Sequence, residues 1–231
     1  MKIAILGDIH GNHLALEACL DSAKEKGVEW LWVTGDLVGY YPFVKEVLDL
    51  LAPWDRKMVS GNHEVMLGKA LHDPEYLSII TEKYGSSIKI ALDTLNSELI
   101  TQLIALPRVL NINIDETVAT LCHGSPVNVD EYIYPDTDLS ELEWLDQVNG
   151  NLIVSGHTHY PMLREWGGLT FLNPGSVGQP RNKIRKAHWV LFDSTKQTFD
   201  FMLEDYDIKT IIDAVKRIDP SNTYLQTVLT R

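Results

Sequence analysis

Cysteine is scarce in this chain of 231 residues, since Cys19 and Cys122 are the only two. Two thiols cannot build the disulfide framework of a small secreted protein, so the composition favours a reducing compartment. Long apolar runs are also missing: none approaches the roughly 18 residues that a membrane helix requires, and the stretch after Met1 is too short for a signal peptide. We therefore expect a cytoplasmic protein that does not enter a membrane.

Basic residues are the second shortage. The chain has 20 lysines and arginines against 32 aspartates and glutamates, a formal net charge of −12, and its only basic cluster is the short segment 181–186. Proteins that bind long nucleic acids normally carry a basic stripe, because neutralised phosphates and released counterions supply the affinity. The charge therefore argues against a long nucleic acid as partner. A small anion can still bind where metal ions supply positive charge.

The remaining composition, with 45% apolar and 23% charged residues, is that of an ordinary folded protein. A length of 231 residues fits one large α/β domain, 1–231, that can bury its own core. Helical patterns follow Asn12 and Asp207, which both suit N-caps. The residues of about 64–106 carry no site chemistry, and we expect a helical excursion there. Within it, the apolar spacing from Ile88 to Leu103 predicts one amphipathic helix that ends before Pro107.

Five apolar, β-rich runs each end in a small residue followed by polar side chains. The runs, with the small residues that end them, are 3–7, 30–35, 58–61, 118–122 and 152–156. Continuous apolar runs of this length are typical of strands buried on both faces. Open α/β sheets place their ligands in the loops just beyond the strand ends. The sequence therefore predicts an α/β fold with one site assembled at several strand ends.

Seven side chains with oxygen or imidazole donors stand just beyond these runs: Asp8, His10, Asp36, Asn62, His123, His157 and His159. In an extended chain, residues i and i+2 point to the same side. Asp8 and His10 are therefore expected to face one site, as are His157 and His159. Seven donors suit two metals about 3.5–4 Å apart that share a carboxylate. A nitrogen and oxygen set without thiolate predicts manganese, iron, zinc or cobalt, with manganese or iron first.

These motifs resemble those of the calcineurin-like metallophosphoesterase superfamily. The matching segments are 7–12, 35–36, 61–64, 123–124 and 156–159, and segment 173–181 resembles a stretch of the small bacterial and archaeal phosphodiesterases of that superfamily. The resemblance implies a four-layer α/β/β/α sandwich of two mainly mixed β-sheets flanked by helices. It implies a first metal held by Asp8, His10, Asp36 and His159. It implies a second metal held by Asp36, Asn62, His123 and His157, with Asp36 bridging the two.

His63 would then be the general acid rather than a ligand. Two cations lower the pKa of a bridging water, so that hydroxide is available for attack on phosphorus near neutral pH. The leaving alkoxide needs a proton, which an imidazole can give. The predicted activity is hydrolysis of a small phosphorylated substrate, either a phosphodiester or a nucleotide phosphoanhydride. A phosphomonoester phosphatase is one alternative, and a catalytically silent metal-binding scaffold is another, although no ligand is missing.

One difference from the protein-phosphatase members of that superfamily narrows the range of expected substrates. Those relatives carry an aspartate and an arginine after the Gly-Asp motif, which orient the acid and grip phosphate. Here Asp36 is followed by Leu-Val-Gly-Tyr-Tyr at 37–41, so a phosphoprotein substrate is disfavoured and the group that orients His63 is unidentified. Asn12 and Arg181 could contact the substrate phosphate. A helix cap is the plainer interpretation for Asn12, and a solvated loop cation is an equal alternative for Arg181. The other histidines, the oligomeric state and the native metal are not specified by any motif.

Overall fold

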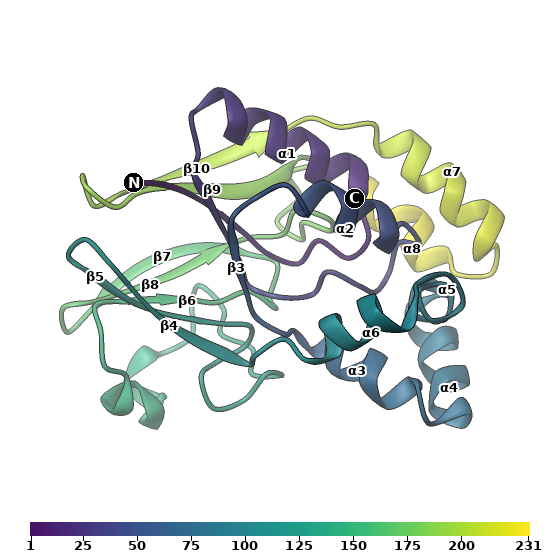
Figure 1. Ribbon diagram of the computed structural model, residues 1–231, viewed down its shortest axis with the longest axis horizontal. Helices are drawn as coiled ribbons and strands as arrows, with labels where there is room; N and C mark the ends of the chain where they lie inside the picture. Colours follow the sequence, from purple (N-terminus) through teal and green to yellow (C-terminus); the bar gives the residue numbers. More distant parts are fainter.

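Two five-stranded β-sheets stack face to face in the computed structural model, which describes residues 1–231 (Figure 1). In the first sheet, the strands lie in the order β10 (Thr198–Glu204), β9 (Ala187–Asp193), β1 (Lys2–Leu6), β2 (Trp30–Val33) and β3 (Arg56–Met58). The three strands β1, β2 and β3 are parallel, whereas β9 and β10 are antiparallel to their neighbours. The apolar runs near the start of the chain thus lie side by side.

The second sheet is also mixed. Its strands lie in the order β4 (Val109–Ile114), β5 (Thr117–Cys122), β6 (Leu152–Val154), β8 (Leu169–Pro174) and β7 (Pro161–Trp166). The central strands β5, β6 and β8 are parallel, and antiparallel β4 and β7 form the two edges. The side chains of β4 alternate between half-buried and exposed from Leu110 to Ile114, as in a strand with one face toward solvent.

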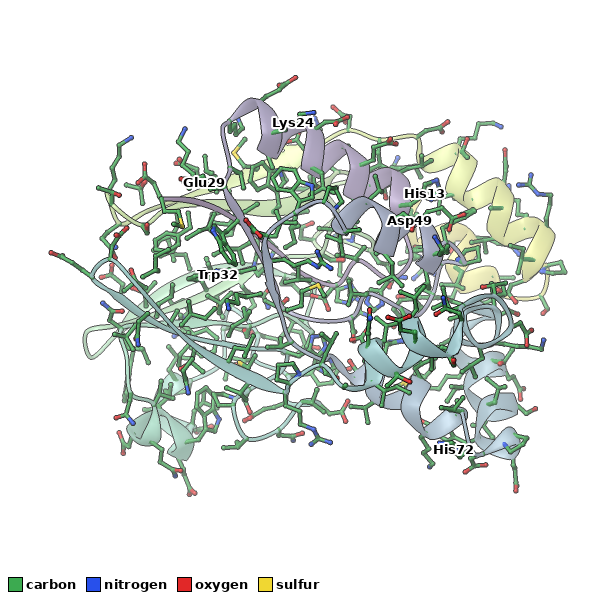
Figure 2. The ribbon with its side chains drawn as sticks, in the orientation of Figure 1. His13, Lys24, Glu29, Trp32, Asp49 and His72 are labelled. Atoms are coloured by element: carbon green, nitrogen blue, oxygen red, sulfur yellow. The ribbon has the colours of Figure 1, made fainter.

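An apolar core fills the space between the sheets. Ile3, Ile5 and Trp32 project into it from the first sheet and meet Leu121 and Val154 of the second. The indole of Trp32 is almost fully buried between the two sheets (Figure 2). The side chains that both sheets direct into this layer must therefore be apolar. The layer therefore fixes the two sheets relative to each other and brings their strand ends together.

Helices cover the outer face of the first sheet. They are α1 (His13–Glu25) and α2 (Val44–Leu51), with α7 (Ile208–Ile218) and α8 (Thr223–Thr227) at one end of the sandwich (Figure 1). Asn12 and Asp207 accept hydrogen bonds from the first turns of α1 and α7, as their predicted capping role requires. The outer face of the second sheet packs on two 3₁₀ turns, Leu139–Glu141 and Glu143–Gln147. The predicted sandwich of two mixed sheets between helices is confirmed.

Between β3 of the first sheet and β4 of the second, the chain forms four helices: α3 (Asn62–Ala70), α4 (Pro74–Tyr84), α5 (Ser87–Thr94) and α6 (Ser97–Ile104). The prediction of one helix from Ile88 to Leu103 is wrong. The chain is extended at Leu95, and the Asn96 side chain accepts a hydrogen bond from Leu99 N, which starts a new helix. Apolar spacing continues through the break because both helices bury the same side. No helix in the structure is long and apolar enough to cross a membrane.

Candidate active site

The seven predicted donor residues lie together at one end of the sandwich. Each follows the carboxyl end of a strand, namely β1, β2 and β3 in the first sheet and β5 and β6 in the second. All seven side chains are buried, and Asn62 is the most exposed at 8%. Parallel strands bring their carboxyl ends to one edge, and the stacking of two sheets brings two such edges together. The site is therefore an outcome of the topology.

The backbone carries strain at this site. Of nine non-glycine residues with positive φ, five are donor residues: Asp8, His10, Asp36, His157 and His159. Their φ angles of 51° to 68° lie in the left-handed region, which side chains with a Cβ adopt at a cost of about 1–3 kcal/mol. The predicted reason for the pairing, an extended chain that points residues i and i+2 to one side, is thus wrong. Tight left-handed turns aim these side chains, and such strain persists where the surrounding structure holds it.

Four side chains form the first half of the site. His10 Nε2 lies 3.1 Å from His159 Nε2, 3.6 Å from Asp36 Oδ2 and 4.0 Å from Asp8 Oδ1. His159 Nε2 is 3.4 Å from Asp8 Oδ1. Donor atoms about 2.0–2.2 Å from one ion lie about 3.0–3.6 Å apart at the angles of octahedral or tetrahedral coordination. Most of these separations are in that range.

The second half of the site has the same spacing. His123 Nε2 lies 3.0 Å from Asn62 Oδ1, 3.2 Å from His157 Nδ1 and 3.3 Å from Asp36 Oδ2. The oxygen atom Asp36 Oδ2 thus lies within 4 Å of one imidazole in each half. His157 and His159, two residues apart, face different halves.

Hydrogen bonds to the backbone fix the imidazole rings. His10 Nδ1 donates to Val38 O at 3.0 Å, and His123 Nδ1 donates to Thr34 O at 2.7 Å. His159 Nδ1 makes the same bond to a carbonyl at 2.6 Å. In its neutral form, with the proton on Nδ1, each ring turns the lone pair of Nε2 into the site. Two such lone pairs only 3.1 Å apart repel each other, so the donor set fits a cation between them.

The ionisable groups of the buried site differ in how far their pKa values are shifted. Burial raises the pKa of Asp8 to about 7, although His123 opposes the shift. Burial alone would lower the pKa of His123, but the Asp36 carboxylate raises it to about 10. Burial would raise the pKa of Asp36, but His123 and His63 hold it well below its usual range. The anionic Asp36 oxygen is therefore the main source of negative charge, and divalent cations would fit beside it.

His63 stands beside the donors on the first turn of α3. Its ring packs against the rings of His10, Tyr40 and Tyr84, at centroid distances of 4.8, 5.0 and 5.3 Å. Its Nδ1 is buried without a hydrogen-bond partner. A Cβ added at Gly39, whose φ is +93°, would lie 2.1 Å from that nitrogen. Ring packing and the Gly39 backbone therefore orient His63, in place of the missing carboxylate.

Glu64 is a site residue to which the sequence assigned no role. Its buried carboxylate accepts hydrogen bonds from the backbone N–H of Asp36, Leu37, Val38 and Gly61, at 2.8–3.1 Å. Burial raises the pKa of Glu64 to about 7, and the neighbouring Asp36 adds to the shift. One side chain thus ties the Asp36 loop to the start of α3. It holds Asp36 and Asn62 in place without being a donor to the site.

We expect Glu64→Ala to lower the free energy of unfolding by about 3 kcal/mol or more, because four buried N–H groups lose their acceptor. Urea denaturation at pH 8, above the Glu64 pKa, would measure this effect. A chelator in the buffer removes any contribution of lost metal binding. Glu98→Ala, on the exposed surface of α6, is the control and should change stability by roughly 0.5 kcal/mol or less. Equal stability of the two variants would contradict the role given to Glu64.

The two predicted substrate contacts differ in the structure. Asn12 is fully buried, caps α1, and donates through Nδ2 to Gly178 O at 2.9 Å. Its amide is used within the protein, so we do not propose it as a substrate contact. Arg181 lies beside the site, with Nη2 3.4 Å from the Tyr40 hydroxyl and a buried Nε that has no partner. Its positive charge acts on the pKa values of several candidate ligands, including Asp8.

The segment from 173 to 181 connects the loops that carry the donors. Asn173 Nδ2 donates to Gly156 O at 2.7 Å, beside His157, and Ser176 Oγ donates to Asp8 O at 2.7 Å. The histidines outside the motifs lie elsewhere. His72 is exposed at the end of α3, and His13 begins α1 (Figure 2). His188 is buried in β9 rather than on the surface.

Comparison with known proteins decides the family. The model of the calcineurin-like phosphoesterase superfamily domain matches residues 1–197. The chain belongs to this superfamily. Protein MJ0912 of Methanocaldococcus jannaschii is 32% identical to this metallophosphoesterase over 228 residues, which cover 90% of the chain and 88% of that protein.

Two further relatives support the assignment. The crystal structure of hypothetical protein PH1004 from Pyrococcus horikoshii OT3 superposes with a TM-score of 0.86 at 27% identity, and covers 99% of this chain and 97% of that one. Phosphodiesterase YfcE of Escherichia coli is 22% identical over 184 residues, which are 78% of this chain and 82% of that protein. Calcineurin-like phosphoesterases depend on metals, and this chain brings together His and Asp groups that could hold them.

Proposed function

We propose that this metallophosphoesterase holds two divalent transition-metal ions and hydrolyses small phosphodiesters or nucleotide phosphoanhydrides. The first ion would be held by Asp8, His10, Asp36 and His159, and the second by Asp36, Asn62, His123 and His157. The observation that carries the proposal is the position of Asp36 Oδ2, 3.6 Å from His10 Nε2 and 3.3 Å from His123 Nε2. One carboxylate oxygen serves both halves, as a bridging ligand does.

Manganese and iron are the proposed metals, with zinc and cobalt as alternatives, because imidazole, carboxylate and amide oxygen make up the donor set. When bound, two such ions make a water acidic enough to supply hydroxide and draw charge from the phosphoryl oxygens. The protein contributes the fixed geometry. Three imidazoles are locked by their backbone hydrogen bonds, so little reorganisation is required when the ions or the substrate enter.

His63 is the proposed proton donor to the leaving group. Its Nδ1 is enclosed against Gly39, which leaves Nε2 as the ring nitrogen that can face a substrate. Burial lowers the pKa of His63, although the Asp36 carboxylate opposes the shift. A bound phosphate would add negative charge beside the ring and favour its protonated form.

Arg181 is the proposed protein contact to the phosphoryl oxygens. Its positive charge acts on the pKa values of four candidate ligands, Asp8, His10, His157 and His159. Tyr132 also lies beside the site: it is 50% exposed, and the centre of its ring lies 4.0 Å from that of the His157 ring. An exposed aromatic ring beside a phosphate site suits a nucleoside or aryl group. Both features fit a small nucleotide-like substrate.

We expect diesters to be better substrates than monoesters. A dianionic monoester needs more fixed positive charge than the single Arg181 supplies, whereas a diester carries less charge at phosphorus. The relative YfcE, called a phosphodiesterase, supports the same preference. The test compares kcat/KM for bis-nitrophenyl phosphate and nitrophenyl phosphate, with manganese in excess. A value about tenfold higher for the monoester would show that the chain is a phosphomonoesterase.

A further inference from the structure

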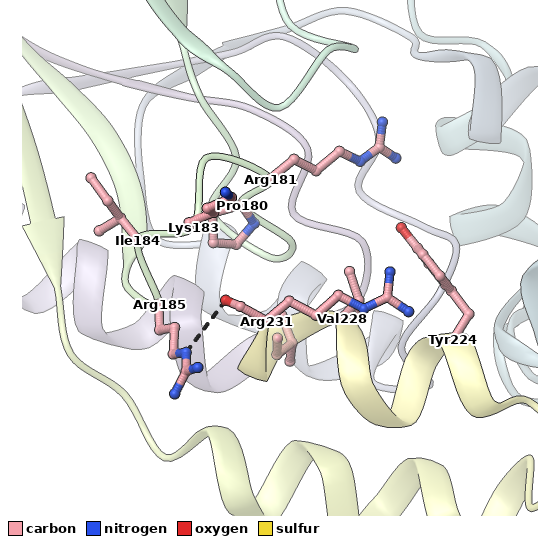
Figure 3. A pocket seen from close by; sticks show the side chains of 9 residues that line it. Pro180, Arg181, Lys183, Ile184, Arg185, Tyr224, Val228 and Arg231 are labelled. Carbon is pink, nitrogen blue, oxygen red and sulfur yellow. Dashed lines mark hydrogen bonds between the residues drawn. The ribbon is translucent and has the colours of Figure 1, made fainter.

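A cavity of about 200 Å³ lies between the loop that follows β8 and the C-terminal helix (Figure 3). Pro180 and Ile184 line it from the loop, Tyr224 lines it from α8, and Val228 and Leu229 line it from the 3₁₀ turn Val228–Thr230 that follows. The remaining lining residues are Arg181, Lys183, Arg185 and Arg231. We call this cavity the basic pocket. In a chain with a net charge of −12, it gathers four of the 20 lysines and arginines.

The four cations of the basic pocket have no acidic partners. The ion pairs of the lysines involve other residues, such as Lys45 with Asp49 and Lys209 with Asp213. Arg185 Nε donates to the main-chain oxygen of Arg231 at 3.4 Å. The Arg231 guanidinium donates to Thr227 Oγ1 at 3.1 Å and lies 5.1 Å from the centre of the Tyr224 ring. Lys186, next to Arg185 in sequence, differs: it points outside the pocket and pairs with Asp205 at 2.7 Å. A cavity lined by four cations that pair with no aspartate or glutamate makes a site for an anion.

The basic pocket adjoins the candidate active site through two contacts. The Arg181 side chain borders the pocket and reaches the Tyr40 hydroxyl at 3.4 Å, and the Tyr40 ring packs on His10. Figure 3 shows the Arg181 guanidinium extending away from Lys183 and Arg185. On the other wall, the Tyr224 hydroxyl donates to Gln179 Oε1 at 3.2 Å, and Gln179 O accepts from His159. One residue therefore separates the pocket wall from candidate ligands on each side.

We propose that the basic pocket binds the phosphate groups beyond the scissile one in an oligophosphate substrate. This proposal rests on the proposed function, because it places the scissile phosphate at the two-metal site. A volume of about 200 Å³ is enough for one or two phosphates. Arg181, between the two sites, would contact the chain of phosphates where it passes from one to the other. Substrates with several linked phosphates would then bind more tightly than single-phosphate diesters.

The test measures the binding of two dinucleosides that differ in phosphate number. Titration calorimetry on manganese-loaded His63→Ala protein compares a dinucleoside tetraphosphate, made resistant to hydrolysis by methylene groups in place of its bridging oxygens, with a dinucleoside monophosphate. In that background we expect Lys183→Gln combined with Arg185→Gln to raise Kd for the tetraphosphate by about tenfold or more, the usual effect of losing a charged contact. Kd for the monophosphate should stay within about twofold, because its single phosphate lies at the metals. The double variant removes one hydrogen bond, the exposed one from Arg185 to Arg231, so the fold does not depend on the two charges.

Lys186→Gln is the matched control, since it removes a charge from the same cluster but from outside the basic pocket. It should leave both dissociation constants unchanged. Three results would overturn the proposal: equal weakening of both ligands, no weakening of the tetraphosphate, or equal affinity of the unaltered pocket for both ligands. The proposed function has a separate readout. It is wrong if the wild-type protein with manganese hydrolyses neither dinucleoside nor bis-nitrophenyl phosphate, whatever the calorimetry shows.

Discussion

Asp36→Asn should remove most of the bound metal and lower turnover by about 10³-fold or more, because one oxygen of Asp36 is proposed to serve both ions. Asp36 Oδ2 lies 3.6 Å from His10 Nε2 and 3.3 Å from His123 Nε2. Its other oxygen accepts a hydrogen bond from His63 N at 2.9 Å. Asparagine keeps an oxygen for that hydrogen bond but replaces the bridging carboxylate with a neutral amide. Metal content per chain, measured by elemental analysis after loading and gel filtration, should fall from about two to below one.

Two variants make this result specific. His10→Ala removes a proposed ligand of the first ion only, so it should retain about one ion per chain. Asp49→Asn, on the exposed surface of α2 where it pairs with Lys45, should retain both ions and full turnover. If Asp36→Asn keeps as much metal as His10→Ala, the carboxylate belongs to one ion and the bridging assignment fails. A normal thermal unfolding profile of Asp36→Asn in chelator would show that the fold is intact.

The fold could be predicted from the sequence where local patterns decide the structure. Continuous apolar runs such as 3–6 and 152–154 predict strands that are buried on both faces, and they are central strands of the two sheets. Asn12 and Asp207 cap α1 and α7 as their side-chain chemistry predicts. The break at Leu95 was not predictable from spacing, because the two helices on either side of it bury one apolar face. A local choice, the cap at Asn96, decides it.

The donor residues of the candidate site could also be predicted, since the ends of parallel strands converge. The reason first given for the Asp8–His10 and His157–His159 pairs was wrong, because their backbones are left-handed rather than extended. Such conformations depend on contacts with the rest of the fold. Gly178 illustrates this: a Cβ there would lie 2.0 Å from Ile9 O, so segment 173–181 packs directly on the Asp8–His10 turn.

The supporting residues were beyond reach of the sequence. Glu64 accepts hydrogen bonds from three N–H groups of the Asp36 loop, which lie 26 to 28 residues away in the sequence. A fourth comes from Gly61, three residues before it. Tyr84, at the end of α4, packs on His63 at a ring distance of 5.3 Å. The four cations of the basic pocket come from two distant segments, 181–185 and the C-terminal residue 231. In each case a polar or aromatic side chain gains its role only through tertiary contacts, which no local pattern specifies.

His63→Ala should keep both metals yet lower turnover by about 10²–10⁴-fold on substrates with an alkoxide leaving group, the usual contribution of a positioned acid. His63 also lies close enough to His10 and Asp36 to be a ligand, so metal content decides between the two roles. The loss should shrink on bis-nitrophenyl phosphate, because nitrophenolate leaves with little need for a proton. His72→Ala, at an exposed histidine on the surface of the helical segment, is the control and should have no effect on either substrate.

Gly39→Ala tests the position of the acid without removing it. The added Cβ would lie 2.1 Å from His63 Nδ1, so the ring must move, and the loss of turnover should again be larger for alkoxide than for nitrophenolate leaving groups. Gly167→Ala is the matched control: its φ is +58°, but no atom lies within 4 Å of the added Cβ. It should therefore show the cost of backbone strain alone, in stability rather than in turnover. Only a proton donor makes the loss of turnover depend on the basicity of the leaving group. If His63→Ala and Gly39→Ala each lose as much turnover with nitrophenolate as with alkoxide leaving groups, His63 binds or orients the substrate instead.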